Sequence, residues 1–142
     1  MKILTLGTFD CLHSGHLGLF RQCRRIAGPD GVVVVAVNTD LFVEKYKHRT
    51  PLMPYKARSE VIAELRTVDQ VFANYGDDNQ PPLIDHVAPD VIVIGEDWAK
   101  NNYLAQIGVT QRWLDDRNIQ LCYVPRTGDW SSTALRAHAL GT

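Results

Sequence analysis

Short runs of valine, isoleucine and leucine recur along this chain, and segments with helical spacing of apolar residues lie between them. The runs occupy residues 3–6, 32–37, 71–73, 91–94 and 121–124. They are nearly uninterrupted, as is typical of parallel strands that are covered on both faces. The helical segments are residues 17–26, 56–65, 82–87 and 110–117, followed by a last helix expected at about 131–140. This alternation predicts an α/β fold, a Rossmann-like doubly wound parallel sheet of about five strands with helices on both faces.

Length and composition agree with such a fold. The chain has 142 residues, of which 45% are hydrophobic and 22% are charged. A chain of this length suits one domain and can bury a substantial core without disulfides or a structural metal. No repeat, linker or low-complexity tract divides the sequence, so we expect a single domain over residues 1–142.

The distribution of charge narrows the class of ligand. The formal net charge is −1, so nothing global points to a nucleic acid or an acidic membrane surface as a partner. Basic side chains nevertheless crowd the first half of the chain, which suits a small anionic substrate better than a polyanion. They are Arg21, Arg24, Arg25, Lys45, Lys47, His48, Arg49, Lys56 and Arg58.

Several features predict a cytoplasmic protein without a membrane partner. The three cysteines are odd in number and form no C-x-x-C pair, which favours a reducing compartment over a disulfide scaffold. The longest apolar run, residues 32–37, is too short to span a bilayer. Met1 leads directly into strand-like residues, so we expect no signal peptide.

The turn after the first apolar run carries the most unusual motif. Residues 7–16 read GTFDCLHSGH, so a glycine-containing turn leads from a strand into a helix, where ligands of open α/β sheets bind. The start of a helix attracts phosphate. His13 and His16 are three residues apart and can direct two imidazoles at one anion, while Gly15 lets the ligand approach the backbone. A single histidine here is usually a cap or a surface group, but two around a glycine favour a functional interpretation.

The histidine spacing could also suggest a metal pair. Zinc sites usually add further cysteine, histidine or carboxylate ligands at recognisable spacing. The remaining histidines, His48, His86 and His138, are scattered along the chain, so we do not expect a zinc site.

The run GTFDCLHSGH resembles the first signature of the cytidylyltransferases that act on glycerol 3-phosphate, phosphocholine and phosphoethanolamine, Gly-x-Phe-Asp-x-x-His-x-Gly-His. The likeness is greatest to those that act on glycerol 3-phosphate and covers nearly the whole chain. It implies that His13 and His16 are catalytic and that the surrounding turn binds nucleotide, through Gly7, Thr8, Phe9, Asp10 and Gly15. Asp10 could bind a hydrated metal or anchor the turn, and the resemblance implies Mg²⁺ bound with CTP.

Residues 38–58 carry a second group of candidates. Asn38 and Asp40 follow the second apolar run, where such a fold presents ligand contacts, although Asp40 could equally cap a helix. Residues 41–55 lack clear periodicity and read as a basic loop, which is usually a solvated surface. The family places lysines of such a loop over the triphosphate, and Lys45 and Lys47 fit those positions best. The resemblance also implies that Arg58, with Lys47, faces the acceptor phosphate.

Two further stretches match the family. Residues 95–98, GEDW, resemble the family's Gly-Asp-Asp-Trp, which assigns Gly95 and Asp97 to the nucleotide, whereas Trp98 is expected to be a packing residue. Residues 125–133 resemble Arg-Thr-x-Gly-Ile-Ser-Thr-Thr, with the glycine one place early and a tryptophan in place of isoleucine. The start of a helix with hydroxyls and an arginine suits β- and γ-phosphates. The residues implied are Arg126, also as a catalytic group, and Thr127, Ser131, Ser132 and Thr133.

Taken together, the resemblance implies transfer of a cytidylyl group from CTP to a small phosphorylated alcohol, with glycerol 3-phosphate favoured, by a homodimer. The wider superfamily includes adenylyltransferases with the same two histidines, so adenylyl transfer to FMN or a sugar phosphate is an alternative. A nucleotide-binding module without turnover is a second alternative. The Arg126–Thr127 pair resembles the CTP-using branch more than the adenylyl-transferring branch.

Overall fold

A computed structural model describes residues 1–126 and residue 138, and it contains one parallel five-stranded sheet. The strand order is β3-β2-β1-β4-β5, and every neighbouring pair is parallel. The bounds are β1 (Lys2–Gly7), β2 (Val32–Asn38), β3 (Gln70–Asn74), β4 (Val91–Gly95) and β5 (Gln120–Val124). Each strand contains one of the five apolar runs, so the predicted α/β class and strand number are confirmed.

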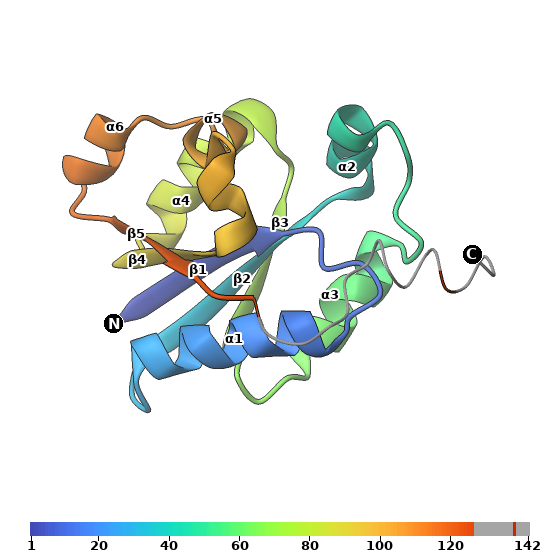
Figure 1. Cartoon of the computed structure of the whole chain (residues 1–142), viewed down its shortest axis with the longest axis horizontal. Helices are drawn as coiled ribbons and strands as arrows, with labels where there is room; N and C mark the ends of the chain where they lie inside the picture. Colours follow the sequence, from blue (N-terminus) through green and yellow to red (C-terminus); the bar gives the residue numbers. More distant parts are fainter. Residues whose placement is uncertain (127–137, 139–142) are drawn as a thin grey trace.

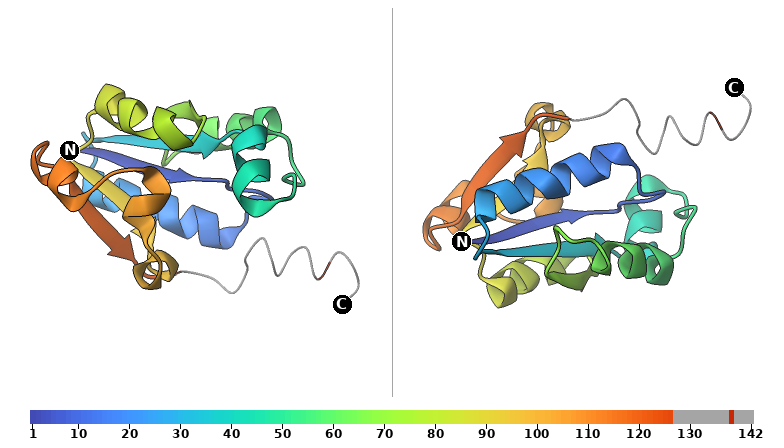
Figure 2. Two further views of the ribbon diagram at one scale, coloured as in Figure 1. Left: turned by 90° about the horizontal axis from the view of Figure 1, so that it is seen from above. Right: turned by 90° about the horizontal axis from the view of Figure 1, so that it is seen from below.

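Helices cover both faces of the sheet (Figures 1 and 2). They are α1 (Ser14–Ala27), α2 (Asp40–Lys47), α3 (Tyr55–Ala63), α4 (Gln80–Val87), α5 (Tyr103–Ile107) and α6 (Gln111–Asp115). Short 3₁₀ turns are η1 (Asp77–Asn79) and η2 (Glu96–Lys100). One core cluster joins α1 and α3 to the sheet through Phe20, Cys23 and Ile62. A second joins α4, α5 and α6 to the other face, so the sheet is doubly wound as predicted.

The strands of the sheet are almost fully buried at its centre, because helices pack on both sides. In β2, residues 33–37 have no exposed surface at all. All strands run the same way, so their carboxyl ends meet at one edge of the sheet, beside α2 (Figure 2). No helix in the described part of the chain is both long and apolar enough to cross a bilayer.

Two differences from the sequence-based expectation concern the helices. The prediction of an irregular segment over residues 41–55 was wrong for its first half, which forms α2. Thr39, not Asp40, caps that helix by accepting a hydrogen bond from the Phe42 amide, and His48 ends it in the left-handed conformation at φ 57°. Helix α5 was not predicted. The helix expected at 131–140 lies outside the described residues, apart from His138.

Candidate functional site

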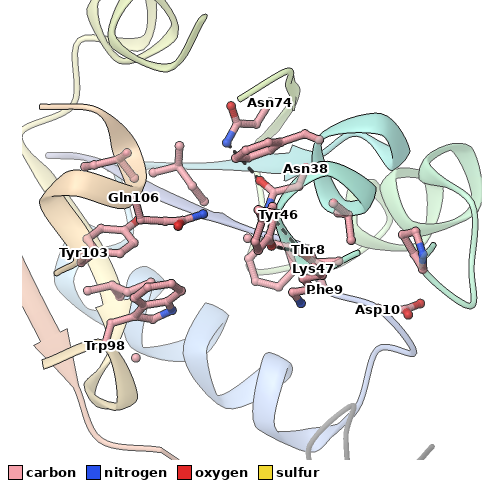
Figure 3. A pocket seen from close by; sticks show the side chains of 18 of the residues that line it. Thr8, Phe9, Asp10, Asn38, Tyr46, Lys47, Asn74, Trp98, Tyr103 and Gln106 are labelled. Atoms are coloured by element: carbon pink, nitrogen blue, oxygen red, sulfur yellow. Dashed lines mark hydrogen bonds between the residues drawn. The ribbon is translucent and has the colours of Figure 1, made fainter. Parts of the chain in front are cut away.

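A cavity of about 380 Å³ opens at the carboxyl edge of the sheet, over the ends of β1, β2 and β4 (Figure 3). Helix α2 forms one wall, and η2 with α5 forms the other. Nine of the candidates predicted from sequence line it: Gly7, Thr8, Phe9, Asp10, His16, Asn38, Lys47, Gly95 and Asp97. The structure therefore brings together, from three separate stretches of chain, residues that the sequence placed at one sheet edge.

The turn after β1 has an unusual backbone that depends on Gly7. Phe9 and Cys11 both adopt positive φ, at 53° and 50°. This folds the Phe9 ring back over β1, where a Cβ on Gly7 would lie 2.8 Å from it, closer than real Cβ contacts allow. The Phe9 ring also packs edge-on against His16, with centroids 5.6 Å apart. Gly7 is thus needed for the ring that supports one of the two motif histidines.

His13 and His16 together cap the start of α1. His13 is the N-cap residue, and its Nδ1 accepts a hydrogen bond from the Gly15 amide at 3.1 Å. His16 Nδ1 accepts in turn from the His13 amide at 3.3 Å. This reciprocal pair is a capping box, in which imidazoles replace the usual hydroxyl and carboxylate. The Nδ1 atoms of both histidines therefore serve as helix caps, the ordinary role of a histidine at this position.

The cap also fixes the proton on each ring. A nitrogen that accepts a hydrogen bond carries no proton, so the neutral imidazole holds its proton on Nε2, which is then a donor. Burial lowers the pKa of His16 to about 3, and the charges of His13, Arg126 and Lys47 act in the same direction. Burial and then the Arg126 charge lower the pKa of His13. At neutral pH the helix start thus offers two neutral Nε2–H donors.

Asp10 fastens the turn to the segment between α2 and α3. Its two carboxylate oxygens accept from the amides of Leu52 at 2.8 Å and Met53 at 2.9 Å, and the residue is almost fully buried. Of the two roles left open by the sequence, the geometry corresponds to the anchor. The described residues contain no group of three or more metal-ligating side chains.

Arg58 is the clearest correction to the expected site. Its guanidinium donates to the carbonyls of Thr8, Asn38 and Met53 and to the Asp40 carboxylate, at 2.7–2.9 Å. The side chain is fully buried. The prediction that it faces the acceptor phosphate does not agree with this placement, because four donors are committed within the protein and no surface is left for a ligand. Arg58 instead joins the ends of β1 and β2 to the chain before α3.

The two lysines of α2 have different surroundings. Lys47 lines the cavity, and its charge contributes to the lowered pKa of His16. Lys45 instead forms an exposed ion pair with Asp77 at 2.6 Å and does not line the cavity. A helix places residues two apart on different faces, which explains why only one of them reaches the site. The expected role of Lys45 over the triphosphate therefore does not fit this arrangement.

Arg126 is the last residue of the described range 1–126. Its guanidinium is 3.5 Å from the Asp97 carboxylate, and its charge contributes to the lowered pKa of both histidines. The ends of β4 and β5 thus approach the start of α1, as the sequence motifs require. The other residues of that motif, Thr127, Ser131, Ser132 and Thr133, lie outside the described residues.

A chain of buried amides forms the floor of the cavity. Asn38 Nδ2 lies 3.2 Å from Thr8 Oγ1 and 3.3 Å from the Tyr46 hydroxyl. Asn74 Nδ2 donates to Asn38 Oδ1 and to Gln80 Oε1. Apart from Asn38 and Thr8, the residues of this network were not predicted. An asparagine at the end of the third apolar run was the available signal for Asn74, whereas nothing in the local sequence distinguishes Tyr46 or Gln80.

Comparison with known proteins identifies the family. A family model described as cytidylyltransferase-like matches residues 4–138, so the chain belongs to the cytidylyltransferase-like family, as its motifs suggested. It is accordingly a nucleotidyltransferase by class. The resemblance inferred from GTFDCLHSGH is confirmed.

Two relatives match nearly the whole of this chain. The chain is 35% identical over 135 residues to the FAD synthase of Korarchaeum cryptofilum, and the match covers 94% of this chain and 88% of that protein. It is 30% identical over 142 residues to the glycerol-3-phosphate cytidylyltransferase of Bacillus subtilis, covering 99% of this chain and 98% of that protein. The two relatives thus carry different names, an FAD synthase and a glycerol-3-phosphate cytidylyltransferase.

A solved structure shares the fold. The lipopolysaccharide core biosynthesis protein of Thermoplasma volcanium superposes with a TM-score of 0.69 at 24% identity, covering 92% of this chain and 98% of that chain. At this identity the likeness supports the architecture only.

Proposed function

We propose that this protein transfers a cytidylyl group from CTP to glycerol 3-phosphate and releases pyrophosphate. The observation that carries nucleotidyl transfer is the pair of neutral Nε2–H donors at the start of α1, beside the cationic side chains of Lys47 and Arg126. The choice of CTP rests on the GEDW stretch at 95–98 and the Arg126–Thr127 pair, which resemble the cytidylyltransferases. The Bacillus subtilis relative, whose length this chain matches throughout, supports the same choice.

The proposed step needs no covalent intermediate on the protein. A phosphate oxygen of the acceptor attacks the α-phosphorus of CTP, the bond from that phosphorus to the bridging oxygen of the β-phosphate breaks, and pyrophosphate leaves with the electron pair. The acceptor phosphate is already ionised near neutral pH, so no general base is required. Catalysis then consists of holding the two phosphates in line and stabilising the charge that develops on their oxygens.

The residues of the candidate site have different roles in that step. His13 and His16 donate from Nε2 to oxygens of the α- and β-phosphates, and being neutral they do so without a proton transfer. Lys47 approaches the reacting phosphates from α2, and Arg126 holds the outer phosphates with the hydroxyls of 127–133. Asp10 and Arg58 do not touch substrate in this scheme but hold the segment that follows Lys47.

Mg²⁺ is proposed as part of the nucleotide substrate. The described residues offer no cluster that fits a resident metal, and both Asp10 oxygens are occupied by amides. Mg²⁺ commonly keeps several waters and binds through substrate phosphates, so it would arrive with CTP and neutralise part of the triphosphate charge.

A second candidate is adenylyl transfer from ATP to FMN. The specific observation in its favour is the 35% identity to the archaeal FAD synthase, over nearly the whole chain. Both candidates use the same histidine pair, so the histidine geometry does not separate them.

Pyrophosphate release measured with each nucleotide against each acceptor separates the candidates. We expect turnover with CTP, Mg²⁺ and glycerol 3-phosphate, and little with ATP. Turnover with ATP and FMN exceeding that with CTP and glycerol 3-phosphate would establish the second candidate. Tight binding of CTP without product from any acceptor would indicate a non-catalytic module.

We also propose, from family resemblance, that the protein is a cytoplasmic homodimer with no nucleic-acid or membrane partner. Light scattering at assay concentrations would give twice the mass of the 142-residue chain if the dimer forms. A monomeric mass under active conditions would refute it.

A further inference from the structure

The last turn of α2, which carries Lys47 at the edge of the cavity, has little buried surface of its own. Among residues 44–50, all of which the structure describes, Tyr46 is the only one that is not exposed. The apolar residues that pack α2 onto the rest of the protein, Phe42 and Val43, lie about one turn earlier in the helix. The position of Lys47 therefore depends on how Tyr46 is held.

The Tyr46 hydroxyl forms a triangle of hydrogen bonds with the motif turn and the end of β2. It lies 2.9 Å from Thr8 Oγ1 and 3.3 Å from Asn38 Nδ2, and that amide nitrogen lies 3.2 Å from Thr8 Oγ1. An amide nitrogen is only a donor, so it donates to both oxygens, while the two hydroxyls share the third bond. The triangle thus ties the last turn of α2 to the turn that leads into His13 and His16.

Asn38 gives this triangle a fixed base. The residue is 6% exposed, and its Oδ1 accepts from Asn74 Nδ2 at 3.0 Å. Asn74 also donates to Gln80, whose Nε2 donates to the Gln106 carbonyl at 2.8 Å. Hydrogen bonds therefore continue from Tyr46 on one wall of the cavity, through its floor, to α5 on the other wall (Figure 3). Tyr46 is held against the sheet and not against a surface loop.

The Tyr46 ring transmits this constraint to Lys47. The Lys47 ammonium lies over the ring, 5.6 Å from its centroid, a distance at which a cation is attracted to an aromatic face. The ring also packs against Phe42, with centroids 5.0 Å apart. The ring is thus held by Phe42 and by its own hydroxyl, and it supports the ammonium group of the next residue.

The ion pair between Lys45 and Asp77 is a weaker tie for the same turn. The two side chains are 70% and 55% exposed. Solvent screens an exposed pair of this kind, and its long side chains keep much of their freedom. The bonds of Tyr46 are therefore the contacts that we expect to fix Lys47.

We propose that Tyr46 is a positioning residue, whose hydroxyl holds Lys47 at the reacting phosphates through its bonds to Thr8 and Asn38. The proposal rests on the proposed nucleotidyl transfer, in which Lys47 contacts those phosphates, and it adds a residue that acts through Lys47. A donor stabilises developing charge best when it is aligned before the reaction, so a displaced donor lowers the rate more than the affinity.

Tyr46→Phe removes the hydroxyl and keeps the ring that packs against Phe42 and Lys47. We expect kcat to fall by about tenfold while KM for the nucleotide changes by less than about twofold, because the Lys47 ammonium is misplaced but still present. Amides in the last turn of α2 should exchange faster with solvent, while those of α1 keep their wild-type rates. Unchanged kcat, or unchanged exchange in α2, would overturn the proposal.

A double variant with Lys47→Ala tests whether Tyr46 acts through Lys47. In the Lys47→Ala background, Tyr46→Phe should lower kcat by less than about twofold, because the side chain that it positions is absent. A further tenfold loss would mean that the hydroxyl acts on the substrate itself or on the fold as a whole, and would overturn the proposal.

Tyr75→Phe is the matched control. Tyr75 is 66% exposed, its hydroxyl makes no hydrogen bond to any of the described residues, and it does not line the cavity. Its removal should leave kcat and the exchange of α2 as in the wild type. A loss of kcat as large as that of Tyr46→Phe would show that the effect is not specific to Tyr46 and would overturn the proposal.

The kinetics use whichever pair of nucleotide and acceptor the wild type turns over fastest, which separates this proposal from the proposed function. Faster turnover with ATP and FMN would refute the choice of CTP and leave the coupling between Tyr46 and Lys47 measurable. If no pair is turned over, the proposed function fails, and the exchange measurement decides whether Tyr46 holds the segment of Lys47. Faster exchange in Tyr46→Phe would then support the tie, and exchange at the wild-type rate would overturn it.

Discussion

The imidazole rings of His13 and His16 stack with their centroids 3.8 Å apart, and the Nδ1 of His16 accepts from the backbone amide of His13. One ring nitrogen of each histidine thus serves the helix, and the other is available as a donor. A serine–glutamate capping box would satisfy the same amides but would leave no N–H donors at the helix start. The motif therefore combines a structural and a chemical requirement in the same two side chains.

Substitution can separate those two requirements at His13. Asparagine is a good N-cap residue, so His13→Asn should keep the hydrogen bond to the Gly15 amide while the Nε2–H is lost. We expect kcat to fall by about a hundredfold or more with little change in thermal stability. His13→Ala should lose the same activity and in addition about 1 kcal/mol of stability. Near-normal kcat in His13→Asn would show that the residue acts only as a cap.

The depressed pKa of His16 predicts a pH-dependent stability. Its pKa is about 3 in the folded protein and 6.5 in the reference state, so between these values the unfolded chain binds more protons. The contribution of His16 to stability is complete above about pH 6.5 and declines as the pH falls toward 3, by at most about 1.4 kcal/mol per pH unit. Denaturant unfolding of wild type and His16→Gln should differ in slope over this range, since glutamine keeps an acceptor at this position. Titration of His16 near pH 6.5 by NMR would contradict the prediction.

Lys45 and Lys47 form a matched pair for testing the basic segment. Lys47→Ala should lower kcat/KM by at least about tenfold, because a charge-assisted contact to phosphate is lost. Lys45→Ala removes only an exposed ion pair with Asp77, so its kinetics and melting temperature should stay close to those of the wild type. Equal impairment of both variants would mean that α2 rearranges when nucleotide binds.

The strands and the first motif could be predicted from sequence because each is a contiguous signal. Helix α2 could not, because its apolar residues 41–43 are consecutive and one of them, Leu41, is 80% exposed. Helix α5 offers only three large apolar residues, Tyr103, Leu104 and Ile107, within a single turn and a half. A periodic pattern needs several turns to stand out, and these helices are eight and five residues long.

Some residues of the candidate site could be predicted from sequence and others could not, for the same reason. His13, His16 and Asp10 lie within ten consecutive residues, whereas the amide floor combines residues from β2, β3 and α4 that only the fold brings together. Arg58 shows a different difficulty. A sequence shows that a residue is charged but not whether its charge is buried, so an arginine following a basic segment resembles a ligand until its partners are known.

Arg58 should be a stability residue rather than a substrate contact. Arg58→Met leaves the carbonyls of Thr8, Asn38 and Met53 without their donor, which we expect to cost about 3 kcal/mol or more of unfolding free energy. Arg58→Lys should not restore it, because one ammonium cannot reproduce the planar guanidinium's four bonds. Chemical denaturation measures the free energy of unfolding of both variants. Unchanged stability together with a raised KM for the acceptor would show that Arg58 contacts the acceptor phosphate after all.

Asp10 provides the last prediction, because its two bonds hold the segment that follows Lys47. The carboxylate accepts from the amides of Leu52 and Met53, while Arg58 holds the Met53 carbonyl. Asp10→Asn keeps one acceptor oxygen but turns an NH₂ donor toward the second amide, so one bond is replaced by a repulsive contact. We expect faster hydrogen exchange at residues 52–53 and a lower kcat, because Lys47 is then held less firmly.

The Mg²⁺ dependence distinguishes this role from metal binding. If Asp10 only anchors the segment, Asp10→Asn should need the same Mg²⁺ concentration for half-maximal activity as the wild type, at a reduced maximum. Removal of a metal ligand would instead raise the required concentration and leave the exchange at residues 52–53 unchanged. The anchoring role thus predicts faster exchange with an unchanged Mg²⁺ requirement, and metal binding predicts the reverse. Exchange at residues 52–53 as slow in Asp10→Asn as in the wild type would exclude the anchoring role of Asp10.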